Sequence, residues 1–472
     1  MFLAPTDLYE ISRIISSLKR KNSSGHDGIS ASLIKDINHE ISLPLTILIN
    51  KSLSTGMVPD LLKTAKVIPI YKAKDKEQLN NYRPISLLPT ISKILEKIIH
   101  KRLYNFLLSQ SVFYQSQYGF RPKHSTTHAI HEFVDQAITS FEEKKTTLGV
   151  FLDLSKAFDT INHRILLSKL EWYGVRGTAL EWFRSYLSNR KQFVQYKETK
   201  SSTHTIPCGV PQGSVLGPLL FIIYTNDLPN CLKFSKAILF ADDTTVYLTS
   251  KNISDLFNNI NSDLELLSEW FRANKLSLNI GKTNYVVFKQ NPTQLDEHLK
   301  IKIGNNVIEK KNVIKFLGIY IDAKLEWQDH IKYIKNKLNS SLYALRKVKN
   351  ILSTNHLTIL YYSLIYPYVD YGISLWGATY KTHVNKIFIK QKKAIRIMTG
   401  AQYNAHTNPL FKQLNIVKLD DLYKLQIAKF MYTFFLKTLP SPLTTLFTSN
   451  ETYIHMIPEI VKTHMYHNDE FF

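Results

Sequence analysis

The stretch Phe240-Ala241-Asp242-Asp243 joins two short apolar runs, residues 237–240 and 246–248. Two runs of strand-forming residues with a short polar break predict a β-hairpin with both acids at its tip. A tight turn projects the two carboxylates together, and a divalent cation offsets their repulsion. Carboxylate oxygens suit Mg²⁺, which proteins hold with one or two carboxylates plus substrate phosphates. Asp is also a common turn residue, so the pair alone leaves a metal site and a plain turn both open.

The composition favours a folded protein with a polyanionic partner. The 472 residues suffice for two or three domains, and 44% of them are hydrophobic, which supports a sizeable core. Lys and Arg number 60 against 38 Asp and Glu, and the formal net charge of +22 points to nucleic acid. The basic residues are spread along the chain, which disfavours a membrane-surface protein, since such proteins gather their charge in one block.

The two cysteines, Cys208 and Cys231, exclude a disulfide scaffold and a cysteine-rich zinc module. We therefore expect an intracellular, reducing compartment, with nucleus and cytoplasm both open. The N-terminus lacks the apolar core of a signal peptide. The longest apolar stretch, residues 216–224, is too short to span a bilayer, so we expect no membrane partner.

Hydrophobic periodicity divides the chain into helical and extended segments. We expect helices over residues 7–20 (with Thr6 or Asp7 as N-cap), 91–108, 253–274, 328–350 and 384–398, and a strand over 148–154. Residues 67–70 form a short apolar run that ends in a basic stretch. The last two helices mix isoleucine and leucine with many lysines, among them Lys390, Lys392 and Lys393. A charge run is usually a solvated face, but at +22 a contact with a phosphate backbone is at least as well supported.

A second acidic segment comes before the hairpin. The apolar strand that ends at Asp153 continues into a turn that carries Phe158 and Asp159. An Asp at a strand end is often an ordinary cap, but beside an Asp-Asp hairpin it suggests a third metal ligand from a neighbouring strand. Two metal ions held by shared carboxylates form the clamp that serves in-line phosphoryl transfer.

These segments resemble the reverse transcriptases of non-LTR retrotransposons, of the jockey or LINE-like kind. The matching motifs occur in the family's order: residues 81–86, 117–121, 151–159, 209–218, 240–243, 270–283, 316–319 and 366–377. The resemblance covers about residues 20–400. Each motif alone is weak, but the ordered set is specific.

The resemblance implies roles for particular residues. Asp153, Asp242 and Asp243 would hold two Mg²⁺ or Mn²⁺ ions, and Lys282 would protonate the leaving pyrophosphate. Asp159 would not be a metal ligand.

The resemblance also implies a nucleotide site. Lys72 (with Lys74 as its alternative) and Arg83 would grip the triphosphate. Gln212 and Gly213 would shape the pocket, and the ring of Phe158 would clash with a ribose 2′-hydroxyl. The primer would rest on Phe316, Leu317 and Gly318, and the basic helices would track the template–primer backbone.

We therefore expect an α+β, right-hand polymerase with fingers, a palm made of an antiparallel sheet plus helices, and a helical thumb. The expected divisions are a helical leader (1–51), fingers and palm (52–322), thumb (323–400) and a C-terminal helical extension (401–472). The expected reaction is RNA-directed DNA synthesis with an RNA template, a DNA primer and deoxynucleotides. We expect this chain to encode no endonuclease, zinc knuckle or RNase H.

Three alternatives stay open to different degrees. An intron-encoded reverse transcriptase with an RNA-folding (maturase) role is the nearest enzyme, and the hairpin and thumb motifs favour the retrotransposon branch over it. A bulky Phe158 disfavours an RNA-dependent RNA polymerase. A non-catalytic nucleic-acid-binding remnant would be favoured by loss of Asp153 or Asp242, and both are present.

Overall fold

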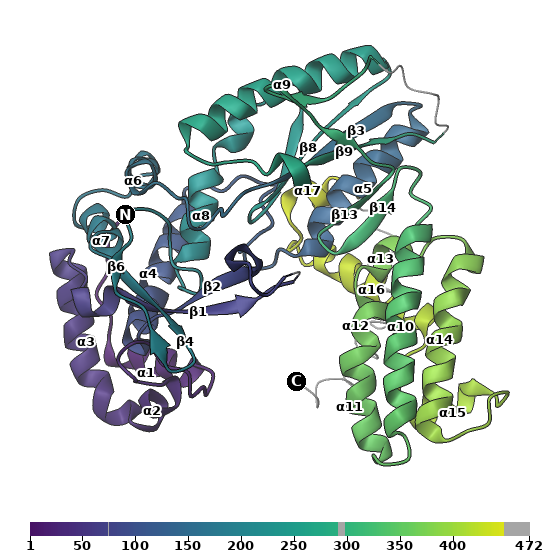
Figure 1. Cartoon of the computed structure of the whole chain (residues 1–472), viewed down its shortest axis with the longest axis horizontal. Coiled ribbons are helices and arrows are strands. Elements are labelled where there is room, and N and C mark those ends of the chain that lie inside the picture. The colour runs from purple at the N-terminus through teal and green to yellow at the C-terminus, as the bar shows by residue number, and fades with distance from the viewer. Residues whose placement is uncertain (74, 291–297, 448–472) are drawn as a thin grey trace. The chain divides into compact units, whose positions relative to one another are not determined.

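The computed structural model describes residues 1–73, 75–290 and 298–447. The chain forms two compact units, each assembled from segments that are distant in sequence. The first contains residues 1–120, 153–233 and 263–279, and the second contains residues 121–152, 234–262 and the described residues from 280 onward. Figure 1 labels many of the helices and strands. Both units take residues from the region 52–322, so the structure subdivides the expected fingers-and-palm domain.

The first unit is mainly helical. Its helices are α1 (Leu8–Ser17), α2 (Ala31–Asp36), α3 (Asn38–Thr55), α4 (Thr90–Ser109), α6 (His163–Trp172), α7 (Thr178–Leu187) and α8 (Gly217–Thr225). The helices predicted over 7–20 and 91–108 are confirmed as α1 and α4. Of the two candidate caps of α1, Asp7 is the N-cap, because its side chain accepts a hydrogen bond from the Glu10 N–H.

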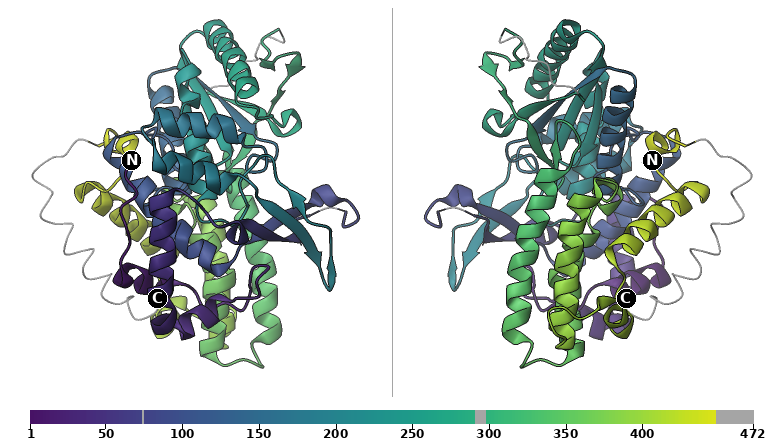
Figure 2. Two further views of the ribbon diagram at one scale, coloured as in Figure 1. Left: turned by 90° about the vertical axis from the view of Figure 1, so that its left-hand side faces the viewer. Right: turned by 90° about the vertical axis from the view of Figure 1, so that its right-hand side faces the viewer.

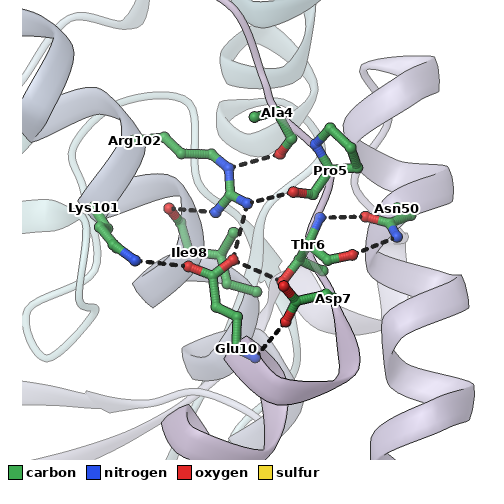
Figure 3. Close-up of polar contacts among 9 residues, drawn as sticks. All are labelled: Ala4, Pro5, Thr6, Asp7, Glu10, Asn50, Ile98, Lys101 and Arg102. Carbon is green, nitrogen blue, oxygen red and sulfur yellow. Dashed lines mark hydrogen bonds and ion pairs between the residues drawn. The ribbon is translucent and has the colours of Figure 1, made fainter.

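An ionic cluster joins α1 to α4 (Figure 3). The Glu10 carboxylate pairs with Lys101 and with Arg102, both at 3.0 Å, and accepts a hydrogen bond from the Thr6 hydroxyl at 2.8 Å. The Arg102 guanidinium also donates to the carbonyl oxygens of Ala4 and Pro5. Burial raises the pKa of Glu10, but the hydrogen bonds from Thr6, Lys101 and Arg102 outweigh burial and lower the pKa to about 2.

The sheet of the first unit is built around β1. Its strands are β1 (Thr64–Tyr71), β2 (Tyr82–Leu87), β4 (Lys191–Tyr196), β5 (Thr199–Lys200) and β6 (His204–Thr205). β1 pairs antiparallel with β2 and parallel with β4, which comes more than a hundred residues later. β5 and β6 pair antiparallel with β4.

The main sheet of the second unit has the order β12-β9-β3-β8-β7. Its strands are β3 (Thr146–Asp153), β7 (Lys236–Phe240), β8 (Asp243–Ser250), β9 (Asn284–Phe288) and β12 (Glu309–Lys310). β3 is central, and its residues 146–152 are all buried, which explains the apolar run over residues 148–152. The Phe133 ring of α5 (Thr126–Glu142) packs against Phe151, Tyr247 and Phe288, so α5 covers one face of this sheet.

Helices dominate the rest of the second unit. They are α10 (Gln328–Val348), α11 (Thr354–Leu364), α12 (Tyr366–Asp370), α13 (Ile373–Trp376), α14 (Lys381–Thr399), α15 (Thr407–Gln413), α16 (Leu419–Phe435) and α17 (Ser441–Thr444). Two small hairpins precede them, β10 (Lys302–Ile303) with β11 (Asn306–Val307), and β13 (Val313–Phe316) with β14 (Ile319–Asp322). The helix α9 (Ile253–Ala273) continues from the second unit into the first.

The predicted helices over 328–350 and 384–398 are confirmed as α10 and α14, which lie side by side (Figure 2). α10 buries Ile331, Ile334 and Leu338, which recur at the three- and four-residue spacing of one helix face. The described part of the expected extension 401–472 contains the helices α15, α16 and α17 joined by short loops, and residues 448–472 lie outside the described part. No helix in the described part of the chain is long and apolar enough to cross a membrane.

Candidate active site

The predicted acidic hairpin is formed by β7 and β8. The two strands pair antiparallel, and the pair nearest the turn is Phe240 with Asp243. Only Ala241 and Asp242 lie between them, and Ala241 adopts a left-handed φ of 55°, which two-residue hairpin turns often require. Asp242 is therefore in the turn and Asp243 is the first residue of β8, and both are exposed.

The third predicted acid closes the neighbouring strand. β3 ends at Asp153, and β3 is adjacent to β8 in the sheet. The Oγ1 atoms of Thr147, near the start of β3, and Thr249, near the end of β8, are hydrogen-bonded at 3.0 Å. The strands therefore run in opposite directions, and the end of β3 lies at the same sheet edge as the start of β8. The Asp153 carbonyl accepts a hydrogen bond from the Asn279 N–H at 2.8 Å.

The chemistry of these acids fits a divalent ion. Asp153, Asp242 and Asp243 offer only carboxylate oxygens, the ligands that Mg²⁺ prefers. Among the residues that the structure describes, no three His, Cys, Asp or Glu side chains are gathered as a ready-made metal site. A Mg²⁺ site made from one or two carboxylates together with substrate phosphates does not need such a cluster.

The two cations predicted to bind triphosphate lie on one face of the first unit's sheet. Ile70 of β1 is opposite Arg83 of β2, and Lys72 follows Ile70 by two residues. The Lys72 N–H donates to the Asn81 carbonyl at 2.8 Å, which extends the β1–β2 pairing past Tyr71. Because side chains alternate along a strand, Lys72 and Arg83 share a face, and both are exposed. Lys74, the alternative to Lys72, lies outside the described residues.

The loop 209–218 is fastened to the same sheet. The Ser86 N–H of β2 donates to the Gln212 carbonyl at 2.7 Å. Gly213 has a φ of +118°, and a β-carbon there would lie 2.7 Å from the Ser86 carbonyl oxygen, so the close approach requires glycine. The Gln212 side-chain amide donates to both carboxylate oxygens of Asp159, at 3.0 and 3.1 Å.

Phe158 lies next to this loop. Its carbonyl accepts a hydrogen bond from the Val210 N–H at 2.9 Å. Its ring stacks on Phe221 of α8, with centroids 4.8 Å apart, and is half-buried. Phe158, Gln212 and Gly213 are therefore connected through contacts of the loop 209–218. Arg83 belongs to β2, the strand whose Ser86 is bonded to Gln212.

Comparison with known proteins identifies the family. The family described as "Reverse transcriptase (RNA-dependent DNA polymerase)" matches residues 72–321, more than half of the chain. The chain belongs to the reverse transcriptase family. This match and the family's known fold class confirm the expected α+β, right-hand polymerase class.

Several of the similar proteins come from mobile elements. The chain is 30% identical over 436 residues to the probable RNA-directed DNA polymerase from transposon BS of Drosophila melanogaster, covering 89% of this chain and 47% of that protein. It is 30% identical over 440 residues to the RNA-directed DNA polymerase from mobile element jockey of the same organism, covering 91% and 48%. These relatives confirm the predicted resemblance to non-LTR reverse transcriptases. The chain spans about half the length of the curated relatives it matches.

A solved structure is also similar. Telomerase from Candida albicans, determined with a fragment of telomeric RNA, is 13% identical with a TM-score of 0.44, covering 77% of this chain and 68% of that one.

The predicted primer-binding turn of this reverse transcriptase is the β13–β14 hairpin. Phe316 pairs with Ile319, and Leu317 and Gly318 form the turn with φ of 44° and 93°. The Tyr371 hydroxyl donates to the Leu317 carbonyl at 2.5 Å and lies within hydrogen-bond distance, 3.0 Å, of the Thr126 hydroxyl. The motif that carries Tyr371 thus holds this turn in place.

Phe316 itself is 4% exposed and packs against the Phe133 and Phe151 rings. Its side chain supports the turn from the core, and Leu317 and Gly318 are the more accessible members of the predicted set. Lys282 ends a short 3-10 turn (Ile280–Lys282) and is exposed. Its role as a proton donor stays a prediction.

The predicted phosphate-tracking lysines belong to a basic cluster shared by α10 and α14. Burial lowers the pKa of Lys390, and the nearby charges of Lys393, Lys335 and Arg346 lower it further. Like charges gathered in this way favour a polyanion. Lys392 is placed differently, because its ammonium lies 4.2 Å from the centre of the Phe388 ring.

Glu96 is a buried anchor of the loop 209–218 that no motif in the sequence predicts. This residue of α4 is fully buried, and its carboxylate accepts hydrogen bonds from the N–H groups of Val215 (2.5 Å) and Leu216 (3.3 Å) and from the Tyr186 hydroxyl (3.0 Å). Burial raises its pKa, against the charge of buried Arg190 and these hydrogen bonds. Glu96 therefore anchors the far end of the loop that carries Gln212, through Val215, which is 119 residues away in the chain.

Proposed function

We propose that this chain copies RNA into DNA, adding deoxynucleotides to the 3′-hydroxyl of a DNA primer, as the polymerase region of a non-LTR retrotransposon protein. The observation that carries the proposal is the exposed Asp242 hairpin at the sheet edge where β3 ends in Asp153, in a chain of the reverse transcriptase family. The relatives are named RNA-directed DNA polymerases, which supports the class of template and product.

Asp153, Asp242 and Asp243 are the residues that would hold the divalent ions, Mg²⁺ or Mn²⁺. Such ions, when bound, favour deprotonation of the attacking hydroxyl and stabilise the charge of the leaving pyrophosphate. The other residues act on the nucleotide. Lys72 and Arg83 neutralise the triphosphate from one face of the sheet, and Arg83 can bind phosphate through two parallel hydrogen bonds. Lys282 supplies a proton to the leaving pyrophosphate.

The loop and its neighbours select the sugar. Gly213 allows the backbone to approach the substrate, and Gln212 beside it borders the nucleotide site. The Phe158 ring is braced by Phe221, so it cannot yield easily to a ribose 2′-hydroxyl. Exclusion of that hydroxyl selects deoxynucleotides.

The second unit grips the template and primer. The Leu317–Gly318 turn supports the primer end, and the basic cluster of α10 and α14 follows the phosphate backbone. Lys390 and Lys393 lie among like charges, so release of counterions on binding nucleic acid is favourable there.

Primer extension by the purified chain tests this proposal. We expect labelled deoxynucleotides to be added to a DNA primer annealed to an RNA template, and we expect the product to disappear when a chelator removes divalent ions. A chain that binds the template–primer duplex and never extends it would contradict the proposal and favour a non-catalytic remnant.

A further inference from the structure

Asp159 is a carboxylate that the proposed mechanism does not use. It is half-buried beneath the loop 209–218. A β-carbon at Gly209 would lie 2.6 Å from the Asp159 carbonyl oxygen, so the loop rests directly on this residue. The Cys208 thiol also donates to that carbonyl, at 3.5 Å. Asp159 is thus part of the floor on which the predicted nucleotide loop lies.

The side chain of Asp159 fixes the orientation of the Gln212 amide. An ionised carboxylate accepts hydrogen bonds and cannot donate them, so the amide nitrogen must face Asp159. Gln212 Nε2 does so, at 3.0 and 3.1 Å from the two carboxylate oxygens. In the described part of the chain, no hydrogen bond from the protein to Gln212 Oε1 is found. That carbonyl oxygen is therefore the group that Gln212 can offer to a ligand.

The backbone of Gln212 is held separately. Its carbonyl accepts the Ser86 N–H at 2.7 Å, and Glu96 holds the loop farther along at Val215 and Leu216. Loss of the Asp159 side-chain contact would leave these anchors in place. The contact between Asp159 and Gln212 therefore sets the orientation of the Gln212 amide, and the other anchors set the position of the loop.

We infer that Asp159 is a positioning residue that aims the Gln212 carbonyl oxygen at a hydrogen-bond donor on the sugar or base of the incoming deoxynucleotide. The inference rests on the proposed function, because it takes Gln212 to border the nucleotide site. Triphosphate oxygens only accept hydrogen bonds at neutral pH, so a carbonyl oxygen cannot bind them. Gln212 reads the nucleoside part, and the cations Lys72 and Arg83 bind the triphosphate.

The substitution Asp159→Asn tests this division of labour, because it keeps the shape and replaces one acceptor with a donor. We expect the KM for deoxynucleotide to rise about tenfold, as for loss of a hydrogen bond to a charged group, with kcat changed by less than about twofold. Inorganic tripolyphosphate, used as a competitive inhibitor, should bind the variant as tightly as the parent. Arg83→Gln is the contrasting variant and should weaken both ligands.

Two further variants make the test specific. In a Gln212→Leu background, Asp159→Asn should raise the KM no further, because the group it aims is gone. Glu326→Gln is the matched control, since Glu326 accepts a hydrogen bond from Gln328 Nε2 at 3.0 Å in the second unit, and it should leave the nucleotide KM unchanged.

Several outcomes would overturn the inference: an unchanged KM, equal weakening of tripolyphosphate, or the same KM increase with and without Gln212. If Asp159→Asn does not fold, Gln212→Leu alone is the test. A higher KM for deoxynucleotide with unchanged binding of tripolyphosphate would support the inference. An unchanged KM would overturn it. If the parent chain extends no primer, the proposed function fails. Equilibrium binding of deoxynucleotide and of tripolyphosphate to parent and variant then still tests Asp159.

Discussion

At the scale of the residue, Phe158 is the side chain that we propose selects the sugar, and its neighbours hold it in place. Its ring is stacked on Phe221 on one side and is only half-buried, and its carbonyl is tied to the Val210 N–H. In the proposed mechanism this ring discriminates by shape, because movement out of the way would break its packing. The resemblance predicts that Phe158 selects the sugar, from its position in the motif. The contact with Phe221 explains how the ring is kept in place.

We expect Phe158→Ala to admit ribonucleotides. Removal of the ring opens the space opposite the 2′ position, and the preference for deoxynucleotides should fall by at least about tenfold, equivalent to about 1.4 kcal/mol of discrimination. Single-nucleotide incorporation with each sugar type measures this ratio. An unchanged ratio would mean that Phe158 is a core aromatic and that another group selects the sugar.

At the scale of the element, two contacts join segments that are distant in the sequence, and local sequence patterns do not predict them. The α1–α4 ionic cluster joins Glu10 to Lys101 and Arg102, and the Tyr371 hydroxyl joins the thumb motif to the Leu317 turn. Each contact links residues far apart in the chain. Periodicity predicts the helices themselves but carries no information about these partners.

We expect the Glu10 cluster to stabilise the fold in a pH-dependent way. The folded pKa of about 2 lies below the ordinary value of 4.5, so the stabilisation is present above pH 4.5 and is lost as the pH falls through the folded pKa. Glu10→Gln should lower the free energy of unfolding by about 1–2 kcal/mol at neutral pH, reduced by the solvent screening of exposed Lys101. Urea unfolding of parent and variant over a pH series measures the difference. A difference that stays constant down to about pH 2 would contradict the assignment.

We expect Tyr371→Phe to weaken extension from the primer end. The change leaves the Leu317 carbonyl without its donor, at a cost of about 1 kcal/mol, so extension should slow about fivefold. Binding of the template–primer duplex should stay within about twofold of the parent. Tyr403→Phe, at a residue that is 89% exposed, is the control for loss of a hydroxyl. Equal effects of the two substitutions would contradict a role for the Leu317–Gly318 turn in binding the primer end.

At the scale of the whole molecule, the net charge of +22 sets the expected mode of binding. Much of it is dispersed, but Lys390 and Lys393 of α14 lie among the charges of Lys335 and Arg346 of α10. A concentrated cluster of this kind releases counterions when it meets a phosphate backbone.

We expect conversion of Lys390, Lys392 and Lys393 to Gln to reduce the slope of log K against log salt. Each lost phosphate contact should lower it by about 0.9 on a B-form duplex. Lys392, which lies over Phe388, should contribute less than the other two. The control converts Lys424, Lys429 and Lys437, which are exposed lysines of the same unit, and removes the same charge. Equal slopes for the two triple variants would identify α14 as a solvated face.

The sequence predicts local structure well and distant pairing poorly. The α10 stripe, the Asp7 cap and the β7–β8 hairpin follow from patterns within a few residues, and all are confirmed. No local pattern in the sequence predicts the parallel pairing of β1 with β4. No local pattern predicts the burial of Glu96 on α4 either. The candidate site residues are predicted because family motifs mark them, whereas the contacts of Asp159 and Glu96 are visible only in the fold.

The central claim is that the acids at the hairpin edge carry the chemistry, and Asp242→Asn tests it most directly. The substitution removes a negative charge from an exposed turn and leaves the β7–β8 pairing intact. Asp255→Asn, at an exposed acid in the first turn of α9, is the matched control. We predict that primer extension on an RNA template is abolished by Asp242→Asn and retained by Asp255→Asn, while both variants bind the duplex as the parent does. Undiminished extension by Asp242→Asn would contradict the account.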